Sequence, residues 1–220
     1  MVLAVVSVGC SSTSTDATAK SRADIRRPGP TRVVLMGDSL IAFNTMGVED
    51  ALGAKYETTN AGIGGASLLD SNVCDGSRAR TLIQHYDPDV VVVEYTGNYA
   101  QRPVTGVLPC RPVVRYGSRD FYNQWKASAR LNQRELHARQ ARVIWVAVPQ
   151  TTDDPYRTVV PGLNRISRAV AGSDRNVADA WSRFGGSTYA PALHLADGLH
   201  LNEPGNEVLA DVIAAQVRHG

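Results

Sequence analysis

From residue 31 onward, apolar runs of strand length alternate with stretches whose apolar residues recur at helical spacing. The runs "DVVVVEY" (89–95) and "RVIWVAVP" (142–149) are almost unbroken, which is typical of strands buried on both faces. The pattern predicts strands at 32–37, 55–61, 89–95, 142–149 and 176–180. It predicts helices at 77–86, 119–139 and 204–218, with a shorter amphipathic stretch near 48–52.

This alternation predicts the fold class. Parallel strands need crossover connections, and helices in those connections cover both faces of the sheet. We therefore expect an α/β protein, a three-layer α/β/α sandwich with a mostly parallel, about five-stranded flavodoxin-like sheet. The chain of 220 residues suits one domain of ordinary size, which we place at 31–220.

The first 30 residues have a different pattern. They are apolar through Gly9 and then continue with Cys10 and a tract rich in Ser and Thr. The apolar run is too short to span a bilayer, which takes about 20 residues. We interpret 1–30 as a signal or lipoprotein-like segment followed by a flexible tether, with Cys10 as the lipidated residue or with cleavage after Ala19. The expected location is then extracellular or in the cell envelope; a tail without any export role is the alternative.

Composition limits the possible partners. The formal net charge is +2, with 23 basic and 21 acidic residues, and no basic stripe indicates nucleic-acid binding. The three cysteines lack a zinc-binding spacing, and no glycine-rich nucleotide motif occurs. We expect no metal and no cofactor, a small-molecule substrate, a monomer, and membrane contact only through an N-terminal lipid anchor.

Polar and glycine-rich segments follow the predicted strands. They are Gly37–Ser39 after the first strand, Asn60–Gly65 after the second, Thr96–Asn98 after the third, and Asp197–His200 before the last helix. Because the carboxyl ends of parallel strands share one edge of the sheet, where ligands bind in such folds, we expect these segments to meet there.

The residue types suit nucleophilic catalysis. A serine hydroxyl needs a base, and a histidine base needs a group that fixes its tautomer. Ser39, His200 and Asp197 could supply these three roles. The backbone N–H groups of Ser39 and Gly65 and the side-chain amide of Asn98 could stabilise an oxyanion.

The assignments of Ser39 and His200 have alternatives. Ser39 could be only a helix N-cap, for which serine is well suited. His194, three residues before Asp197, is the rival base. We interpret Asp38 as bracing the turn before the helix, and we assign no chemistry to Glu94.

Four motifs resemble those of the SGNH hydrolases, also called GDSL esterases and lipases. They are "GDSL" (37–40), "NAGIGGAS" (60–67), "TGNY" (96–99) and "DGLH" (197–200), in the order that this family uses. The third departs from the usual Gly-x-Asn-Asp, with Thr96 for glycine and Tyr99 for aspartate, so these two positions of the pocket wall differ from the family pattern. The resemblance covers about residues 32–215.

The resemblance implies a serine esterase that hydrolyses a carboxylic ester through an acyl-serine intermediate. Lipid esters, short acyl esters and O-acetyl groups on sugars are all compatible with it. An envelope acyltransferase with the same triad is one alternative, and a non-catalytic cell-envelope binding lipoprotein is another.

The cysteines are interpreted in the light of export. If Cys10 is removed or acylated, Cys74 and Cys110 remain as an even pair in an oxidising compartment. We expect them to form a disulfide between the loops that follow the second and third strands. Two unrelated buried thiols are the alternative.

Overall fold

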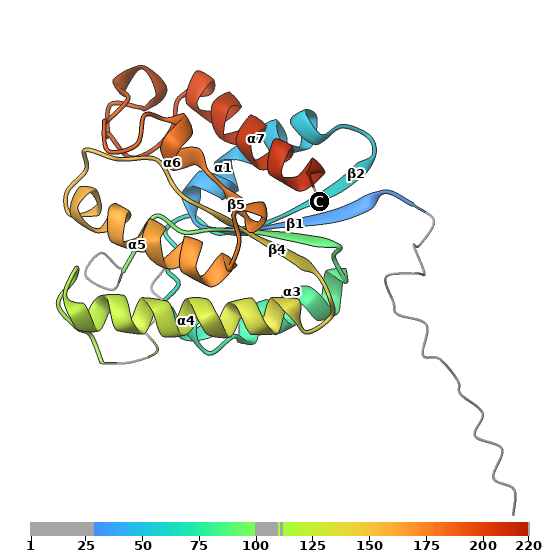
Figure 1. Ribbon diagram of the computed structural model, residues 1–220, viewed down its shortest axis with the longest axis horizontal. Coiled ribbons are helices and arrows are strands. Elements are labelled where there is room, and N and C mark those ends of the chain that lie inside the picture. Colours follow the sequence, from blue (N-terminus) through green and yellow to red (C-terminus); the bar gives the residue numbers. More distant parts are fainter. Residues whose placement is uncertain (1–28, 100–109, 111, 220) are drawn as a thin grey trace, which may run out of the picture.

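A computed structural model describes residues 29–99, 110 and 112–219. Its described part contains a five-stranded sheet with the order β2-β1-β3-β4-β5, in which all neighbouring strands are parallel. The strands are β1 (Thr31–Gly37), β2 (Tyr56–Gly62), β3 (Val90–Glu94), β4 (Arg142–Val146) and β5 (Val177–Ala178). The predicted three-layer α/β/α sandwich is confirmed (Figure 1).

The longer helices cover the two faces of the sheet (Figure 1). One face carries α1 (Ser39–Leu52) and α7 (Glu203–Arg218), and the other carries α3 (Ser77–Tyr86), α4 (Arg119–His137) and α5 (Tyr156–Ala171). The described residues also form short segments, namely α2 (Ser71–Cys74), α6 (Ala180–Arg183), and the 3₁₀ turns η2 (Asp174–Asn176) and η3 (Pro191–Leu193). No described helix combines the length and the apolar character that crossing a membrane requires.

Alternation along the strands separates two apolar cores. In β1, Val34 and Met36 face the side of α3, α4 and α5, where Phe121 and Trp125 are fully enclosed. The neighbouring Leu35 faces the side of α1 and α7. Because successive side chains of a strand point to opposite faces, a strand that is apolar at every position buries both of them.

The helix α5 is absent from the sequence-based prediction. Its buried residues include Val159, Val160 and Leu163, which recur at helical spacing. Pro161 stands among them, and a proline within a helix removes a backbone hydrogen bond and usually interrupts the helix. This proline hides the helical pattern.

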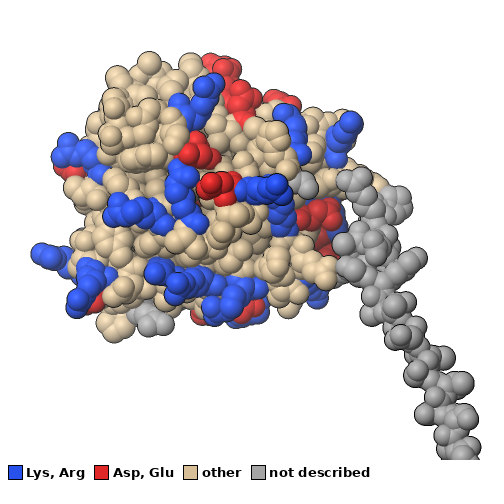
Figure 2. Space-filling view, viewed as in Figure 1, with Lys and Arg blue, Asp and Glu red and all other residues tan. Residues whose placement is uncertain are grey.

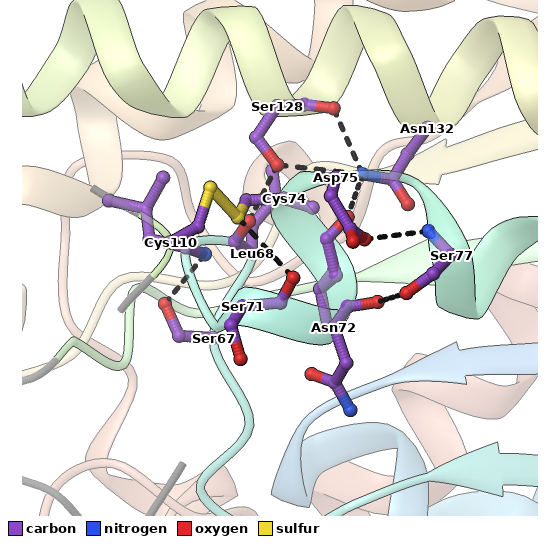
Figure 3. Close-up of a disulfide and its surroundings, with 12 residues drawn as sticks. Ser67, Leu68, Ser71, Asn72, Cys74, Asp75, Ser77, Cys110, Ser128 and Asn132 are labelled. Carbon is purple, nitrogen blue, oxygen red and sulfur yellow. Dashed lines mark hydrogen bonds between the residues drawn. A yellow bond between two sulfur atoms is a disulfide. The ribbon is translucent and has the colours of Figure 1, made fainter. Parts of the chain in front are cut away.

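The disulfide Cys74–Cys110 joins the end of α2, in the segment after β2, to the segment before α4 (Figure 3). The Cα atoms of the two cysteines are 6.1 Å apart, and the Cys110 N–H donates to the carbonyl of Leu69. On the other side of the bridge, Ser128 and Asn132 of α4 donate to the carbonyls of Leu68 and Val73. The disulfide therefore fixes a loop that α4 also holds.

Charges of both signs are mixed on the face drawn in Figure 2, where acidic side chains lie beside many of the Lys and Arg side chains. Arg80 of α3 pairs with Glu135 of α4 at 3.0 Å, and Arg168 of α5 pairs with Asp179 at 2.5 Å. These partly exposed pairs link neighbouring elements and contribute little stability each.

The predicted N-terminal segment, with Cys10, lies outside the described residues.

Candidate active site

Gly37 lets β1 end tightly against β3. In the sheet it is the register partner of both Gly62 and Glu94, and a Cβ atom at this position would collide with the backbone carbonyl of Glu94. The next two residues are Asp38, which is the N-cap of α1, and Ser39, which is the first residue of that helix. The side chain of Asp38 accepts the N–H of Leu40 at 3.2 Å. Asp38, and not Ser39, therefore caps the helix.

The Ser39 hydroxyl is hydrogen-bonded to His200. The distance from its Oγ to the His200 Nε2 is 2.9 Å, and the distance from the His200 Nδ1 to Oδ2 of Asp197 is 2.6 Å. The other oxygen of Asp197 accepts the backbone N–H groups of Leu199 and His200, each at 2.9 Å. The three side chains form one hydrogen-bonded row, although Ser39 and His200 are 161 residues apart in the sequence.

The carboxylate of Asp197 is held in its ionised form. Burial raises its pKa, but the hydrogen bonds from the His200 ring and from the two backbone N–H groups outweigh burial and lower the pKa below the ordinary value. An ionised Asp197 keeps the proton of the imidazole on Nδ1. The Nε2 atom is then free to accept the proton of the Ser39 hydroxyl.

His194, the rival base, lies elsewhere. Its ring is buried between Phe184 and Tyr189, and its Nδ1 bonds to the carbonyl of Ala190 at 2.8 Å. Burial lowers the pKa of this imidazole. Its backbone pairs with Leu201, so His194 supports the loop that carries Asp197 and His200.

The amide of Asn98 is held on two sides. Its Nδ2 donates to Oδ2 of Asp38 at 3.0 Å, and its Oδ1 accepts the hydroxyl of Tyr156 at 2.7 Å. Asn98 is almost entirely buried, and it lies beyond the end of β3. One N–H of the amide is therefore engaged by Asp38, and its oxygen is engaged by Tyr156.

Asp38 links several parts of this edge. Its Oδ2 accepts both the backbone N–H and the hydroxyl of Thr96, at 2.8 and 2.6 Å, in addition to Asn98. Burial raises the pKa of Asp38, and the bonds from Thr96 act in the opposite direction. Thr96, a departure from the usual motif, thus braces the turn through Asp38.

Glu94 lies fully buried beside Asp38. Burial, together with the negative charge of Asp38, raises the pKa of Glu94 well above its ordinary value. This raised pKa favours the protonated form of Glu94 beside the carboxylate of Asp38.

The glycine-rich loop after β2 lies at the same edge. Gly62 pairs with Gly37, and a Cβ on Gly62 would come within 2.8 Å of the backbone of Ala42 in α1. The chain then turns, with the N–H of Ala66 bonded to the carbonyl of Ile63. Gly65 has a φ of 76° in this turn, a conformation that favours glycine.

The remaining departure from the motif, Tyr99, has a structural role. Its hydroxyl accepts the N–H of Val114 at 2.7 Å, and its ring packs against Tyr116 and Phe121.

Two residues near the site were missed by the sequence analysis. Tyr156 lies on the missed helix, and Phe43, whose ring centroid is 5.8 Å from that of His200, was not distinguished from the core residues of α1.

These features define the class of the protein: an α/β hydrolase of the SGNH type, with its motifs gathered at the carboxyl edge of a parallel sheet. The chain belongs to the family described as "Protein of unknown function (DUF459)", whose model matches residues 32–216. This is a family of SGNH/GDSL-like hydrolases. A search of the curated proteins finds no match.

Solved structures share the fold at low sequence identity. The structure of TesA is 19% identical with a TM-score of 0.62, and the alignment covers 86% of this chain and 99% of that one. The α/β hydrolase LAE5, from the metagenome of Lake Arreo in Spain, is 18% identical with a TM-score of 0.64 (86% and 96% covered). The aryl esterase of M. smegmatis is 19% identical with a TM-score of 0.59 (86% and 99% covered).

Proposed function

We propose that this protein is a serine esterase that hydrolyses a carboxylic ester through an acyl-serine intermediate. The observation that carries the proposal is the row from Ser39 Oγ through the His200 ring to Asp197, with distances of 2.9 and 2.6 Å. The proposed nucleophile Ser39 is thus in contact with the proposed base His200, which is in contact with the orienting carboxylate of Asp197. Esterases among the proteins of similar fold, such as the aryl esterase of M. smegmatis, support this class of reaction.

The first half of the reaction acylates Ser39. As Oγ attacks the carbonyl carbon, His200 Nε2 takes the hydroxyl proton, and the carbonyl oxygen becomes an oxyanion. When the intermediate collapses, the bond to the alcohol oxygen breaks and the imidazolium gives its proton to that oxygen. The alcohol leaves, and the acyl group remains on Ser39.

The second half releases the acid. His200 takes a proton from water, whose oxygen attacks the acyl carbon and forms a second tetrahedral intermediate. The Ser39–acyl bond then breaks, and the proton on His200 returns to Ser39 Oγ. In each half, we assign the oxyanion to the N–H groups of Ser39 and Gly65 and to the second N–H of the Asn98 amide.

The experiment that tests the proposal is labelling with a fluorophosphonate probe, which phosphonylates an activated serine. The folded wild-type protein should be labelled at Ser39, as located by peptide mass spectrometry, and should release p-nitrophenol from p-nitrophenyl acetate. Ser39→Ala and the heat-denatured wild type are the controls and should show neither signal. Failure of the folded protein to be labelled would favour the non-catalytic envelope-binding alternative.

Transfer of the acyl group to another acceptor is the second candidate reaction, since any alcohol that reaches the acyl-serine could replace water. Adding an alcohol or sugar acceptor to the esterase assay and quantifying both products distinguishes the two. A hydrolase forms mainly free acid, whereas a transferase forms mainly the new ester.

We also propose that the protein acts outside the cytoplasm, in the cell envelope or beyond it. The support is the Cys74–Cys110 disulfide, because such bonds persist mainly in oxidising compartments. Cell fractionation tests the location, and metabolic labelling with a fatty-acid analogue, with Cys10→Ser as the control, tests the lipid anchor.

A further inference from the structure

One exposed aromatic side chain, Phe43, lies beside the His200 ring. Among the described residues, the large apolar side chains left exposed are Phe43, Met46, Ile63, Tyr86, Val113 and Leu195. The Phe43 ring is 70% exposed and lies against the imidazole, with 5.8 Å between the ring centroids. Leu195 is 49% exposed, and its backbone N–H bonds to the carbonyl of His200 at 2.8 Å.

The helix α1 extends this apolar region away from the nucleophile. Ser39, Phe43 and Met46 are four and three residues apart, so they follow one another along one face of the helix. Met46 is 78% exposed. Seven residues of helix span about 10 Å, and no charged residue occurs in α1 before Glu49.

Leaving such side chains in water is unfavourable, because burying one of them fully is worth roughly 1.5–3 kcal/mol. Single exposed apolar residues are common on protein surfaces, whereas a group of them next to a reactive site is typical of ligand binding. Here the group begins at the candidate nucleophile and its base, which indicates that the ligand it contacts is part of the substrate.

The position of His200 decides which part of the substrate this is. In the proposed reaction, the imidazolium gives its proton to the ester oxygen that leaves, and the alcohol group is attached to that oxygen. The alcohol group must therefore lie beside the His200 ring, against which Phe43 lies and whose backbone is bonded to that of Leu195. The glycine-rich loop and Asn98, assigned to the carbonyl oxygen, come from β2 and β3.

We propose that Phe43, Met46 and Leu195 form a leaving-group surface, which binds an apolar alkyl or aryl alcohol as the leaving half of the ester. This inference rests on the proposed esterase function and deepens it. A sugar in this position would bring several hydroxyl groups against side chains that offer them no strong hydrogen-bonding partner, which is costly.

A pair of isomeric esters tests the inference. Octyl acetate and methyl nonanoate have the same composition and nearly the same hydrophobicity, but the long chain is the alcohol in the first and the acid in the second. With hydrolysis followed by acid titration, kcat/KM for octyl acetate should exceed that for methyl nonanoate by about tenfold. Equal values, or a preference for methyl nonanoate, would overturn the inference and leave the esterase assignment intact.

Substitutions locate the preference on the surface. Phe43→Ser and Met46→Ser should each lower the ratio of the two kcat/KM values by about threefold to tenfold, since each removes one apolar wall. Tyr86→Ser is the matched control, because this exposed side chain ends α3 at the opposite edge of the sheet, and it should leave the ratio unchanged. Variants that slow both esters equally would show a general loss and refute the surface.

The experiments distinguish a failure of the proposed esterase function from a failure of the proposed leaving-group surface. If the wild-type protein is neither labelled at Ser39 nor active on p-nitrophenyl acetate, the proposed function is wrong. If it is labelled and active but indifferent to the position of the long chain, only the leaving-group surface is wrong.

Discussion

Tyr156 donates its hydroxyl to Oδ1 of Asn98 across 2.7 Å, while the Nδ2 atom of the same amide donates to Asp38 across 3.0 Å. An amide is planar, so fixing its oxygen and one of its N–H groups also fixes the direction of the second N–H. The helix that carries Tyr156 therefore orients the group that we assign to the oxyanion.

Tyr156→Phe should lower kcat about threefold to tenfold with little change in KM, because a neutral hydrogen bond of about 1 kcal/mol is lost from the positioning of Asn98. In the Asn98→Ala background, the same substitution should cause no further loss of kcat. Tyr122→Phe on α4 is the control. Additive effects of Tyr156→Phe and Asn98→Ala would mean that Tyr156 does not act through the amide.

Asn98→Ala should lower kcat by roughly 10²–10³-fold with KM changed only slightly, since the oxyanion carries its charge mainly in the transition state. Asn98→Asp should be at least as harmful, because a carboxylate would repel the oxyanion. Measuring the melting temperature and the active-site-titrated kcat on the same sample separates this role from a structural one. Unchanged kcat with lost thermal stability would remove Asn98 from the site.

His200→Ala should reduce kcat by several orders of magnitude, whereas His194→Ala should act mainly on stability. The reason is geometric, since only His200 is bonded to both Ser39 and Asp197. Kinetics and thermal unfolding of both variants provide the test. If His194→Ala abolishes activity in a stable protein while His200→Ala remains active, the base has been assigned wrongly.

Glu94→Gln should stabilise the protein at neutral pH. The pKa of Glu94 is raised in the folded state, so above the ordinary value of 4.5 the unfolded chain loses a proton that the folded protein keeps. Ionisation thus favours the unfolded state increasingly as pH rises from 4.5 toward the folded pKa. Glutamine cannot ionise and removes this cost.

Urea denaturation at pH 4 and pH 8 measures this effect. The free energy of unfolding of Glu94→Gln relative to the wild type should be higher at pH 8 than at pH 4. A difference that does not depend on pH would mean that Glu94 has an ordinary pKa in the folded protein.

The disulfide should stabilise the fold appreciably. Its cysteines are 36 residues apart, and closing a loop of that length is worth about 3–4 kcal/mol. In urea denaturation, the double variant Cys74→Ser/Cys110→Ser should have a free energy of unfolding that is lower by that amount. Reduction should lower the stability of the wild type but not that of the variant. Two free thiols in exported protein, seen by mass spectrometry, would contradict the bridge.

Much of the fold could be predicted because β3 and β4 are apolar at nearly every position, and such strands occur in parallel sheets covered on both faces. The ends of the strands differ from the prediction: β4 ends at Val146, three residues before the apolar run does. Pro161 concealed α5, and Tyr156 was missed with it.

At the site, the motifs predicted which segments meet but not what supports them. The hydropathy pattern does not distinguish the apolar residues of α1 from one another, yet Leu40 and Ile41 are buried while Phe43 is exposed beside His200. That difference depends on how α1 packs against the sheet and α7. Likewise, the raised pKa of Glu94 follows from its own burial and from the negative charge of Asp38 beside it, which no local pattern reveals.

The hydrogen bond between Ser39 and His200 spans nearly the whole domain, and it depends on the docking of α7 against α1, where Asn44 bonds to the carbonyl of Asn206 at 2.9 Å. Because a polypeptide is synthesised from its N-terminus, Ser39 is present in the growing chain long before His200 is. The serine therefore has no base until the C-terminal part of the domain has folded, and only then is the row of three side chains complete. Loss of α7 would leave His200 in the chain but would remove the helix that packs against α1 just after it, so the chemistry is tied to an intact C-terminal end of the domain.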